Sequence, residues 1–177
     1  MAKSEHTHIS LRKVEPSDLP FLYQWENDAS AWADGSNHNP LSQQDLRDYI
    51  AGTTGDIYKD GQLRLIVEEI TNQSSQITTA TVGCIDLFDF DPRNRRSAIG
   101  MYIAPEFRGK GVGKAAVEAL ERYAFEQLDL RVIYAVIATN NEPCSRLYQS
   151  LNYQPSSVLP NWTLESDAVL WLKCKNI

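Results

Sequence analysis

The fold of this chain is decided by Ile99-Gly100-Met101-Tyr102-Ile103-Ala104-Pro105-Glu106-Phe107-Arg108-Gly109-Lys110-Gly111-Val112-Gly113-Lys114. Its first five residues read as a strand, which Ala104-Pro105 ends. From Val112 onward an apolar residue recurs at every fourth position as far as Leu128, and this spacing predicts one face of an amphipathic helix. The chain therefore passes from a strand into a long helix through a glycine-rich elbow, residues 108–114.

The glycine-rich elbow combines three glycines with three cations, Arg108, Lys110 and Lys114. Glycines at alternate positions let backbone N–H groups approach a ligand without obstruction from a Cβ atom. The start of the helix adds free N–H groups and a partial positive charge at the same place. Because all these features attract an anion, we expect the elbow to hold a phosphate or pyrophosphate. The alternative is a helix start that merely contains glycines.

Two common phosphate-binding loops are disfavoured by residues of the elbow and its surroundings. A Walker loop requires glycine at the position of Arg108 and Ser or Thr at that of Ala115, which argues against hydrolysis of a magnesium nucleotide. The dinucleotide fingerprint requires glycine where Lys114 stands. It also requires an acidic residue after the next strand, which ends in Ala138-Thr139-Asn140 instead.

What remains, Arg-Gly-Lys-Gly-Val-Gly after a strand that ends in Ala-Pro, resembles the Gln/Arg-x-x-Gly-x-Gly/Ala motif of the GNAT superfamily of N-acetyltransferases. The resemblance implies acetyl-CoA as cosubstrate, with its pyrophosphate on the elbow, and no metal. It also implies that backbone N–H groups at the end of the strand polarise the thioester carbonyl. The cofactor-binding residues expected in this part of the chain are Met101, Tyr102, Ile103, Arg108, Gly109, Lys110, Gly111, Val112, Gly113 and Lys114.

A second motif follows in Asn141-Glu142-Pro143-Cys144-Ser145-Arg146-Leu147-Tyr148-Gln149-Ser150-Leu151-Asn152-Tyr153. It resembles the family's Asn-x-x-(Ala/Ser)-x-x-Leu-Tyr-x-x-x-Gly-Phe segment. Asn141 is a good N-cap and Pro143 suits a first turn, so we expect a helix to start there. Asn141 and Tyr148 are almost two turns apart, and they share one face with Cys144 and Ser145.

The same resemblance implies roles for this second helix. Asn141 and Ser145 are expected to bind the cofactor, Asn141 at the pantetheine arm, and capping by Asn141 is a compatible alternative. Tyr148 is expected to be catalytic, with its hydroxyl directed at the thioester sulfur; the alternative is packing alone. The family's Gly-Phe is Asn152-Tyr153 here. Asn also adopts the left-handed conformation that ends a helix, so we expect the turn to be kept.

Length and composition predict one domain over residues 1–177. The hydrophobic share of 42% is ordinary for a globular protein, and no apolar run approaches the roughly 18 residues of a membrane span. The first residues lack the hydrophobic segment of a signal peptide, and three cysteines without metal spacing predict free thiols in the cytoplasm. The net charge of -6 argues against a general binder of nucleic acid or membranes. A homo-oligomer is compatible with the sequence.

The order of predicted elements indicates a mixed α/β domain whose central, largely antiparallel sheet is flanked by helices. The resemblance adds that the elbow strand and the following strand splay apart around the cofactor. An irregular stretch is expected at 32–39, a turn at 59–61 and a loop at 74–75. The expected strands are 8–14, 63–67, 79–90, 97–103, 132–138 and two closing strands, the clearer at 169–172; the expected helices begin at 15, 42, 112 and 141.

Acetyl transfer to an amine also needs a group that removes a proton. An alkyl amine with a pKa of about 10.4 is mostly ammonium at neutral pH. The candidate bases are Glu26, at the end of the first helix, Asp86, within a strand, and Asp89. Glu26 and Asp86 are equally suited to bind the charge of the acceptor instead.

The nature of the acceptor stays open between a polyamine, a protein N-terminus, an aminoglycoside and a small amino compound. Cations gather in and before the elbow, whereas acidic residues dominate the first third of the chain, which favours a cationic acceptor. Residues 11–19, 25–28 and 89–96 resemble the ribosomal-protein and spermidine acetyltransferase branch of the superfamily. The alternative function is a non-catalytic acyl-CoA-binding sensor of the same fold; the presence of Tyr148 favours an enzyme.

Overall fold

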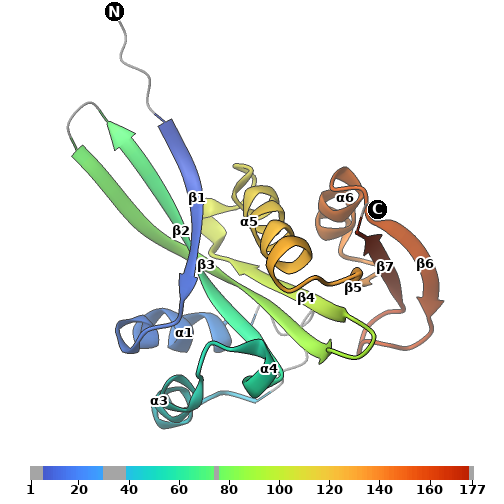
Figure 1. The fold of residues 1–177 in the computed structure, drawn as a ribbon, viewed down its shortest axis with the longest axis horizontal. Helices are drawn as coiled ribbons and strands as arrows, with labels where there is room; N and C mark the ends of the chain where they lie inside the picture. The colour runs from blue at the N-terminus through green and yellow to red at the C-terminus, as the bar shows by residue number, and fades with distance from the viewer. Residues whose placement is uncertain (1–5, 30–38, 74–75, 176–177) are drawn as a thin grey trace, which may run out of the picture.

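A computed structural model describes residues 6–29, 39–73 and 76–175 of the chain (Figure 1). Its strands are β1 (His6–Lys13), β2 (Leu63–Gln73), β3 (Gln76–Asp91), β4 (Arg96–Ile103), β5 (Val132–Ala138), β6 (Gln154–Leu159) and β7 (Ala168–Cys174). Its longer helices are α1 (Leu19–Glu26), α3 (Gln43–Gly52), α5 (Val112–Arg122) and α6 (Glu142–Ser150). Shorter turns of helix are α4 (Ile57–Asp60), the 3-10 turns Pro16–Asp18 and Pro105–Phe107, and a π-turn, Tyr123–Gln127.

The seven described strands form one sheet in the order β1-β2-β3-β4-β5-β7-β6. Every neighbouring pair is antiparallel except β4 and β5, which are parallel. A parallel pair needs a crossover connection, and α5 supplies it. The predicted fold class, a mixed α/β domain with a largely antiparallel sheet, is thereby confirmed.

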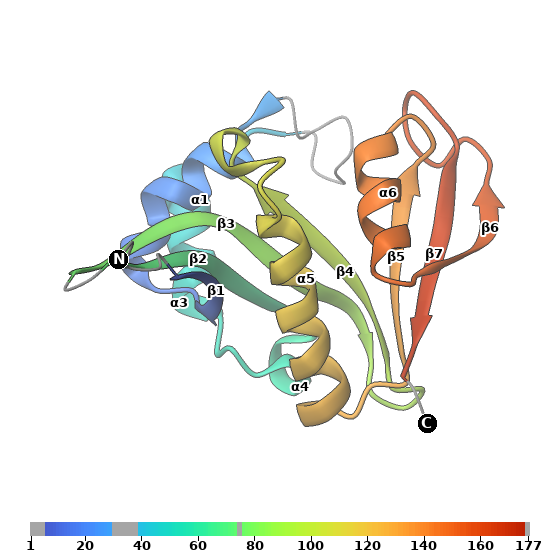
Figure 2. The same ribbon diagram turned by 90° about the horizontal axis from the view of Figure 1, so that it is seen from above.

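The two central strands diverge soon after they begin. β4 and β5 pair only where Arg96–Ala98 lies beside Val132–Tyr134. Beyond these three pairs the strands separate, and Figure 2 shows them spreading from a common end toward the N-terminus of α5. One side of β4 and one side of β5 are therefore left without a partner strand within the described sheet. This is the splay that the family resemblance implied.

Helices cover both faces of the sheet. Alternation along β2 directs Leu63 and Val67 to one face, where they pack in a core with α5 and α6. The intervening Ile66 joins a smaller core with Leu22 of α1 and Leu46 of α3 on the other face. Each face thus buries its own apolar layer, and the elbow lies at the start of α5, beside the open end of the splay (Figure 2).

Several local predictions are confirmed and some are corrected. Ser42 caps α3, and it exchanges hydrogen bonds with Asp45 in the expected capping box. Residues 59–61 were predicted as a simple turn; they end the short helix α4, whose C-cap Gly61 is left-handed (φ 71°). α4 is a single helical turn, which is too short to show the apolar repeat from which a helix is predicted. The irregular stretch 32–39 falls mostly outside the described residues, as does the loop at 74–75.

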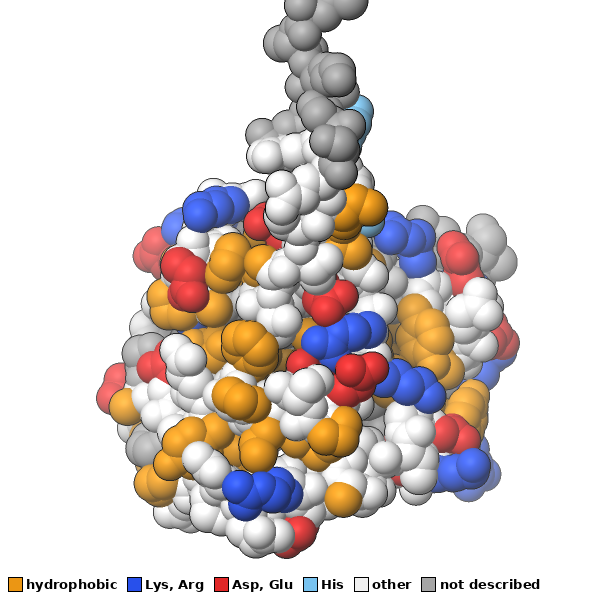
Figure 3. Space-filling view, turned by 90° about the vertical axis from the view of Figure 1, so that its left-hand side faces the viewer, with side chains coloured by type: hydrophobic (Ala, Val, Ile, Leu, Met, Phe, Trp, Pro, Cys, Tyr) orange, Lys and Arg blue, Asp and Glu red, His pale blue; other side chains and the backbone are white. Residues whose placement is uncertain are grey.

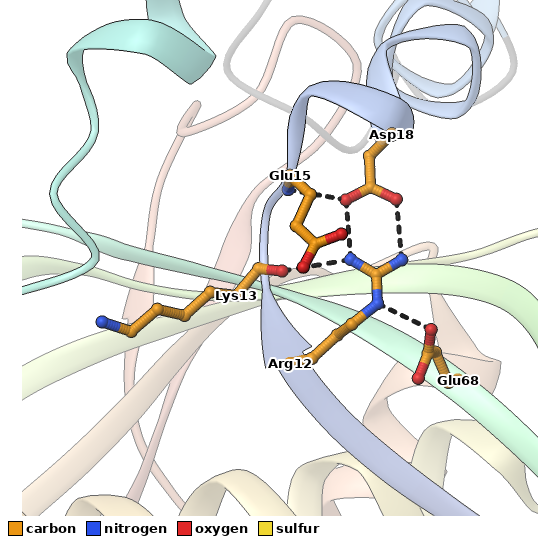
Figure 4. A network of polar contacts seen from close by, with 5 residues as sticks. All are labelled: Arg12, Lys13, Glu15, Asp18 and Glu68. Carbon is orange, nitrogen blue, oxygen red and sulfur yellow. Dashed lines mark hydrogen bonds and ion pairs between the residues drawn. The ribbon is translucent and has the colours of Figure 1, made fainter.

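A partly buried network of ion pairs links β1 to the 3-10 turn Pro16–Asp18, which precedes α1 (Figure 4). Arg12 donates two hydrogen bonds of 2.7 Å to the carboxylate of Asp18, and its Nε donates to Glu68 of β2 at 2.6 Å. Asp18 is only 2% exposed and also accepts from the backbone N–H of Glu15. Burial alone would raise the pKa of Asp18, but the hydrogen bonds and charge of Arg12 hold it below its usual value.

Among the described residues, no helix is long and apolar enough to cross a membrane.

Candidate active site

The glycine-rich elbow has the geometry of an anion cradle. Gly109 and Gly111 adopt left-handed conformations, with φ of 73° and 83°. A Cβ atom at either position would meet no described atom within 4 Å, so the backbone here borders open space. Gly111 is the N-cap of α5, and the N–H groups of Val112, Gly113 and Lys114 have no carbonyl of the helix to bond. The elbow thus presents free donors to an unobstructed volume.

The third elbow glycine joins three elements. A Cβ atom on Gly113 would lie 3.0 Å from Cε of Met101 in β4 and 3.7 Å from Cδ2 of Leu147 in α6. The first turn of α5 therefore approaches both the end of β4 and the α6 helix. Val112 anchors this turn because its side chain is buried in the core. The two sequence motifs meet at this point of the structure.

The three cations of the elbow differ in their surroundings. Arg108 turns back: its Nε donates to the carbonyl of Ile103 at 2.7 Å, and its guanidinium lies 5.4 Å from the centre of the Tyr102 ring. Lys110 lies over the Phe107 ring, and Lys114 is exposed on the first turn of α5. All three cations are exposed, but Arg108 contacts the end of β4, whereas Lys110 and Lys114 do not.

The end of β4 presents its backbone to the splay. Met101, Tyr102 and Ile103 pair with β3 on one side and have no partner strand on the β5 side within the described sheet. The Tyr102 side chain points to the α1 face, where its hydroxyl donates to Asp28 at 2.7 Å. Burial and the negative charge of Asp28 raise the pKa of Tyr102 to about 12. Tyr102 thus supports the strand, and its backbone is what faces the splay.

The α6 helix holds the second motif as expected. The side chain of Asn141 accepts from the backbone N–H of Cys144 at 3.2 Å, which confirms the predicted cap. Ser145 follows on the same side of the helix and is half-buried. Asn152 has φ of 66°, so it replaces glycine in the left-handed turn.

Tyr148 lies inside the protein. It is 2% exposed, and its ring meets that of Tyr153 edge-on, with centroids 4.8 Å apart. Burial, the nearby Cys144 and the charge of Glu121 raise the pKa of Tyr148 well above its usual value. A phenol in this setting keeps its proton at neutral pH and can therefore act as a hydrogen-bond donor. The catalytic role of Tyr148 stays a prediction.

The two expected carboxylates, Glu26 and Asp86, are brought together by an arginine that sequence reasoning missed. Arg64 of β2 binds both oxygens of Asp86 at 2.8 Å and reaches Oε1 of Glu26 at 2.5 Å. Burial alone would lower the pKa of Arg64, but the charges of Asp86 and Glu26 hold it well above its usual value. Tyr49 of α3 lies 5.6 Å from the guanidinium. We refer to Arg64, Glu26 and Asp86 as the Arg64 cluster; it carries one net negative charge.

A signal for Arg64 was present in the strand pattern. Leu63, Leu65 and Val67 alternate toward one face, so Arg64 must point to the other. It lies opposite Asp86 in the β2–β3 register. Register between distant strands is not visible in one sequence, which is why the pair was missed. Asp89, the third candidate base, is exposed near the end of β3, where the register with β4 shifts, and has φ of 47°.

The expected separation of charge is weaker in the structure than in the sequence. The early carboxylates of Asp18, Glu26, Asp28 and Asp45 are each engaged by a neighbouring donor. On the side that Figure 3 shows, acidic and basic side chains lie intermixed. An acidic surface that attracts cations from a distance is therefore not supported, and the Arg64 cluster is the local source of negative charge beside β3.

The chain is similar to known acetyltransferases along most of its length. The family described as acetyltransferase (GNAT) domain matches residues 8–154. The spermidine N(1)-acetyltransferase of Escherichia coli (strain K12) is 25% identical over 148 residues, which cover 82% of this chain and 72% of the relative. A putative ribosomal N-acetyltransferase of Bacillus subtilis (strain 168) is 32% identical over 139 residues, which cover 76% and 72%.

The fold is also that of a solved structure. A crystal structure of spermidine N-acetyltransferase from Vibrio cholerae, in complex with CoA and spermine, matches with a TM-score of 0.81. The match covers 94% of this chain and 95% of that one, at 20% sequence identity. At this identity the match concerns the fold alone.

Proposed function

The chain belongs to the acetyltransferase (GNAT) domain family, and we propose on this premise that it transfers the acetyl group of acetyl-CoA directly to a cationic primary amine of the polyamine type. One observation carries the proposal: β4 and β5 separate beside the elbow. The pantetheine arm of acetyl-CoA could therefore bind between the two strands while its pyrophosphate binds at the elbow. The donors at the start of α5 suit the pyrophosphate. The unpaired side of β4 suits the amides of the pantetheine arm.

The residues of the two motifs divide the binding of acetyl-CoA between them. The backbone of Gly109, Gly111 and the first turn of α5 would hold the pyrophosphate, with Lys110 and Lys114 adding charge. The backbone of β4, at residues 101–103, would hold the pantetheine arm and the thioester carbonyl. Asn141 and Ser145 would line the α6 side of the arm.

The chemistry requires that an ammonium acceptor lose two protons. The first leaves before attack, which frees the lone pair for the thioester carbon; the C–N bond then forms and the C–S bond breaks. The second leaves the nitrogen as the amide forms. Tyr148 would give its hydroxyl proton to the departing sulfur and regain one of the two protons, while the other passes to solvent. No covalent bond to the enzyme is needed.

The Arg64 cluster is the proposed proton acceptor. Two carboxylates share one guanidinium, so one of them can take a proton and leave a neutral ion pair behind. Asp86 is held by both of its oxygens, which makes it the anchor. We therefore assign the base to Glu26, at the end of α1, and the positioning of Arg64 to Asp86.

Two classes of acceptor have specific support. Relatives named spermidine N(1)-acetyltransferase favour a polyamine, and the net negative charge of the Arg64 cluster fits a cation. The relative named putative ribosomal N-acetyltransferase makes a protein N-terminus the second candidate. Cys84, Cys144 and Cys174 form no disulfide with one another, which suits the cytoplasm proposed for the enzyme.

The acceptor is tested by thiol release from acetyl-CoA with a panel of amines: spermidine, a peptide with a free N-terminus, an aminoglycoside and a neutral primary amine. We expect spermidine to give the highest kcat/KM by at least tenfold or so. A higher value for the peptide would replace the polyamine by a protein N-terminus. Acetyl-CoA binding measured by calorimetry, without turnover of any amine, would identify a sensor instead of an enzyme.

A further inference from the structure

A partly buried ion pair joins the C-terminal end of α5 to β7, away from the elbow. Lys173 of β7 donates to Oε2 of Glu121 in α5 at 2.6 Å. Glu121 is only 6% exposed, and its second oxygen, Oε1, is buried with no hydrogen-bond partner among the described residues. A buried carboxylate with one unused oxygen is costly for folding alone, since an apolar pair of the same size would avoid the loss of hydration. The energetic cost of burying this carboxylate suggests that the ion pair has a function besides stability.

Tyr153 connects this ion pair to Tyr148. The ammonium of Lys173 lies 5.6 Å from the centre of the Tyr153 ring, and that ring meets the Tyr148 ring edge-on at 4.8 Å. Tyr153 is 1% exposed, and in the part of the chain that the structure describes its hydroxyl also has no hydrogen-bond partner. A donor on Tyr153 and an acceptor on Glu121 are thus present in the same buried cluster. The resembling motif has phenylalanine at this position, so the hydroxyl is a feature of this chain.

The charges of the Glu121–Lys173 ion pair influence Tyr148. Burial, then Cys144 and then the charge of Glu121 raise the pKa of Tyr148 above the usual phenol value. Burial and then the charge of Glu121 raise the pKa of Tyr153. Lys173 opposes the charge of Glu121 because it is ion-paired with the same carboxylate. The groups that face the two tyrosines are therefore Glu121 from α5, Cys144 from α6 and Lys173 from β7.

We propose that the Glu121–Lys173 ion pair, acting through Tyr153, is a positioning unit that sets how readily Tyr148 gives its proton to the departing sulfur. The proposal rests on the proposed function, in which Tyr148 is the proton donor. The O–H bond of Tyr148 breaks as the S–H bond forms, and the phenolate regains a proton from those that the amine releases. Negative charge nearby opposes this transfer and positive charge favours it.

The unit predicts opposite effects for its two charged members. Lys173→Met leaves the charge of Glu121 uncompensated, so kcat should fall about three- to tenfold. Glu121→Gln leaves the cation, so kcat should be equal to the parent or higher. The double variant should return to within about twofold of the parent, and Lys173→Arg should retain activity. KM for acetyl-CoA should change by less than about twofold throughout.

The matched control is Lys175→Met, which removes a lysine of the same C-terminal segment that is paired with Asp129 at the surface. It should leave kcat unchanged. A fall in kcat for Glu121→Gln equal to that for Lys173→Met, with the double variant worse than both, would indicate ordinary destabilisation and overturn the proposal. Thermal unfolding of each variant shows whether it is folded at the assay temperature.

A second readout needs no acetyl-CoA. NMR of protein labelled with ¹³Cζ-tyrosine, assigned with Tyr148→Phe, reports the hydroxyl environment directly. The Tyr148 signal should shift in opposite directions in Lys173→Met and Glu121→Gln, and stay in place in Lys175→Met; an unmoved signal would overturn the proposal. If Tyr148→Phe keeps the parent kcat, the proton donor of the proposed function fails. If it loses activity while the ion-pair variants do not, only the positioning unit fails.

Discussion

At the scale of single residues, Gly111 offers the sharpest test of the anion cradle. Its φ of 83° and the open space beside it mean that a new side chain would project toward the proposed pyrophosphate. Asp and Asn have the same shape and both tolerate the left-handed conformation. Gly111→Asp should abolish acetyl-CoA binding, measured by calorimetry, because a carboxylate would repel the ligand. Gly111→Asn should weaken binding much less.

The control for backbone strain is Gly61→Asp. Gly61 has φ of 71°, and a Cβ there also meets no described atom within 4 Å, but it ends α4, away from the elbow. This variant should bind acetyl-CoA like the parent. Equal losses in Gly111→Asp and Gly111→Asn would mean that shape rather than charge is responsible, and would remove the support for a pyrophosphate.

Residues whose role is local were predictable from sequence. Asn141 caps α6 and Asn152 takes the left-handed turn because both effects depend on the chain within a few residues. Arg64 was not predictable, since its partners Asp86 and Glu26 are 22 and 38 residues away. The same holds for Lys173 and Glu121, which are 52 residues apart. The residues of the two sequence motifs could therefore be predicted, whereas the ion pairs between distant parts of the chain could not.

At the scale of elements, the Arg64 cluster links the end of α1 to β2 and β3. If Glu26 is the base, Glu26→Gln should lower kcat for spermidine about a hundredfold with little change in KM. If it binds the acceptor's charge, KM should rise more than kcat falls. Asp86→Asn should loosen Arg64 and affect both constants. Steady-state kinetics with thiol release distinguish these outcomes.

Glu68→Gln is the matched control for the Arg64 cluster. Glu68 is also a half-buried carboxylate paired with an arginine, Arg12, at 2.6 Å. It should leave both kinetic constants within about twofold of the parent. If Glu68→Gln lowers kcat as much as Glu26→Gln does, the effect of Glu26 is general destabilisation and the assignment of the base is wrong.

Elements were predictable where one pattern extends over many residues. β5 was predicted with its observed bounds, 132–138, because a short apolar run that is rich in β-branched residues and has polar ends favours a buried strand. The elbow helix was predicted to continue to Leu128, but it ends as an α-helix at Arg122 and passes into the π-turn. An apolar residue at every fourth position is compatible with an α-helix and with a π-turn, so the sequence pattern alone could not show where one changes into the other.

At the scale of the whole molecule, the stability of the fold should depend on the network around Arg12. Arg12→Met removes the partner of the buried Asp18 carboxylate, which should cost about 3 kcal/mol of the free energy of unfolding at neutral pH. The exposed Arg47, whose hydrogen bonds to described side chains are those to Gln43 and Gln44 in α3, supplies the control; Arg47→Met should cost less than about 0.5 kcal/mol. Urea unfolding measures both.

This loss should depend on pH in a defined direction. Asp18 has a lowered pKa in the folded protein, so its contribution to stability is full above the unfolded value of about 4 and is lost as the pH falls through the folded value. The difference between parent and Arg12→Met should therefore shrink as the pH is lowered below about 4. A difference that stays constant down to pH 3 or so would show that the ion pair is not what Arg12 contributes.

The short seam between β4 and β5 has a mechanical consequence. Three residue pairs join β1–β4 to β5, β6 and β7, so the sheet consists of two lobes whose strands pair directly at one end only. A ligand whose amides bond to both lobes would complete the interrupted sheet as an added strand does. Without such a ligand, β4 and β5 expose unpaired backbone N–H and C=O groups in the middle of the sheet, as edge strands do in other sheets. We therefore expect the lobes to hold their relative angle more firmly when the gap is filled.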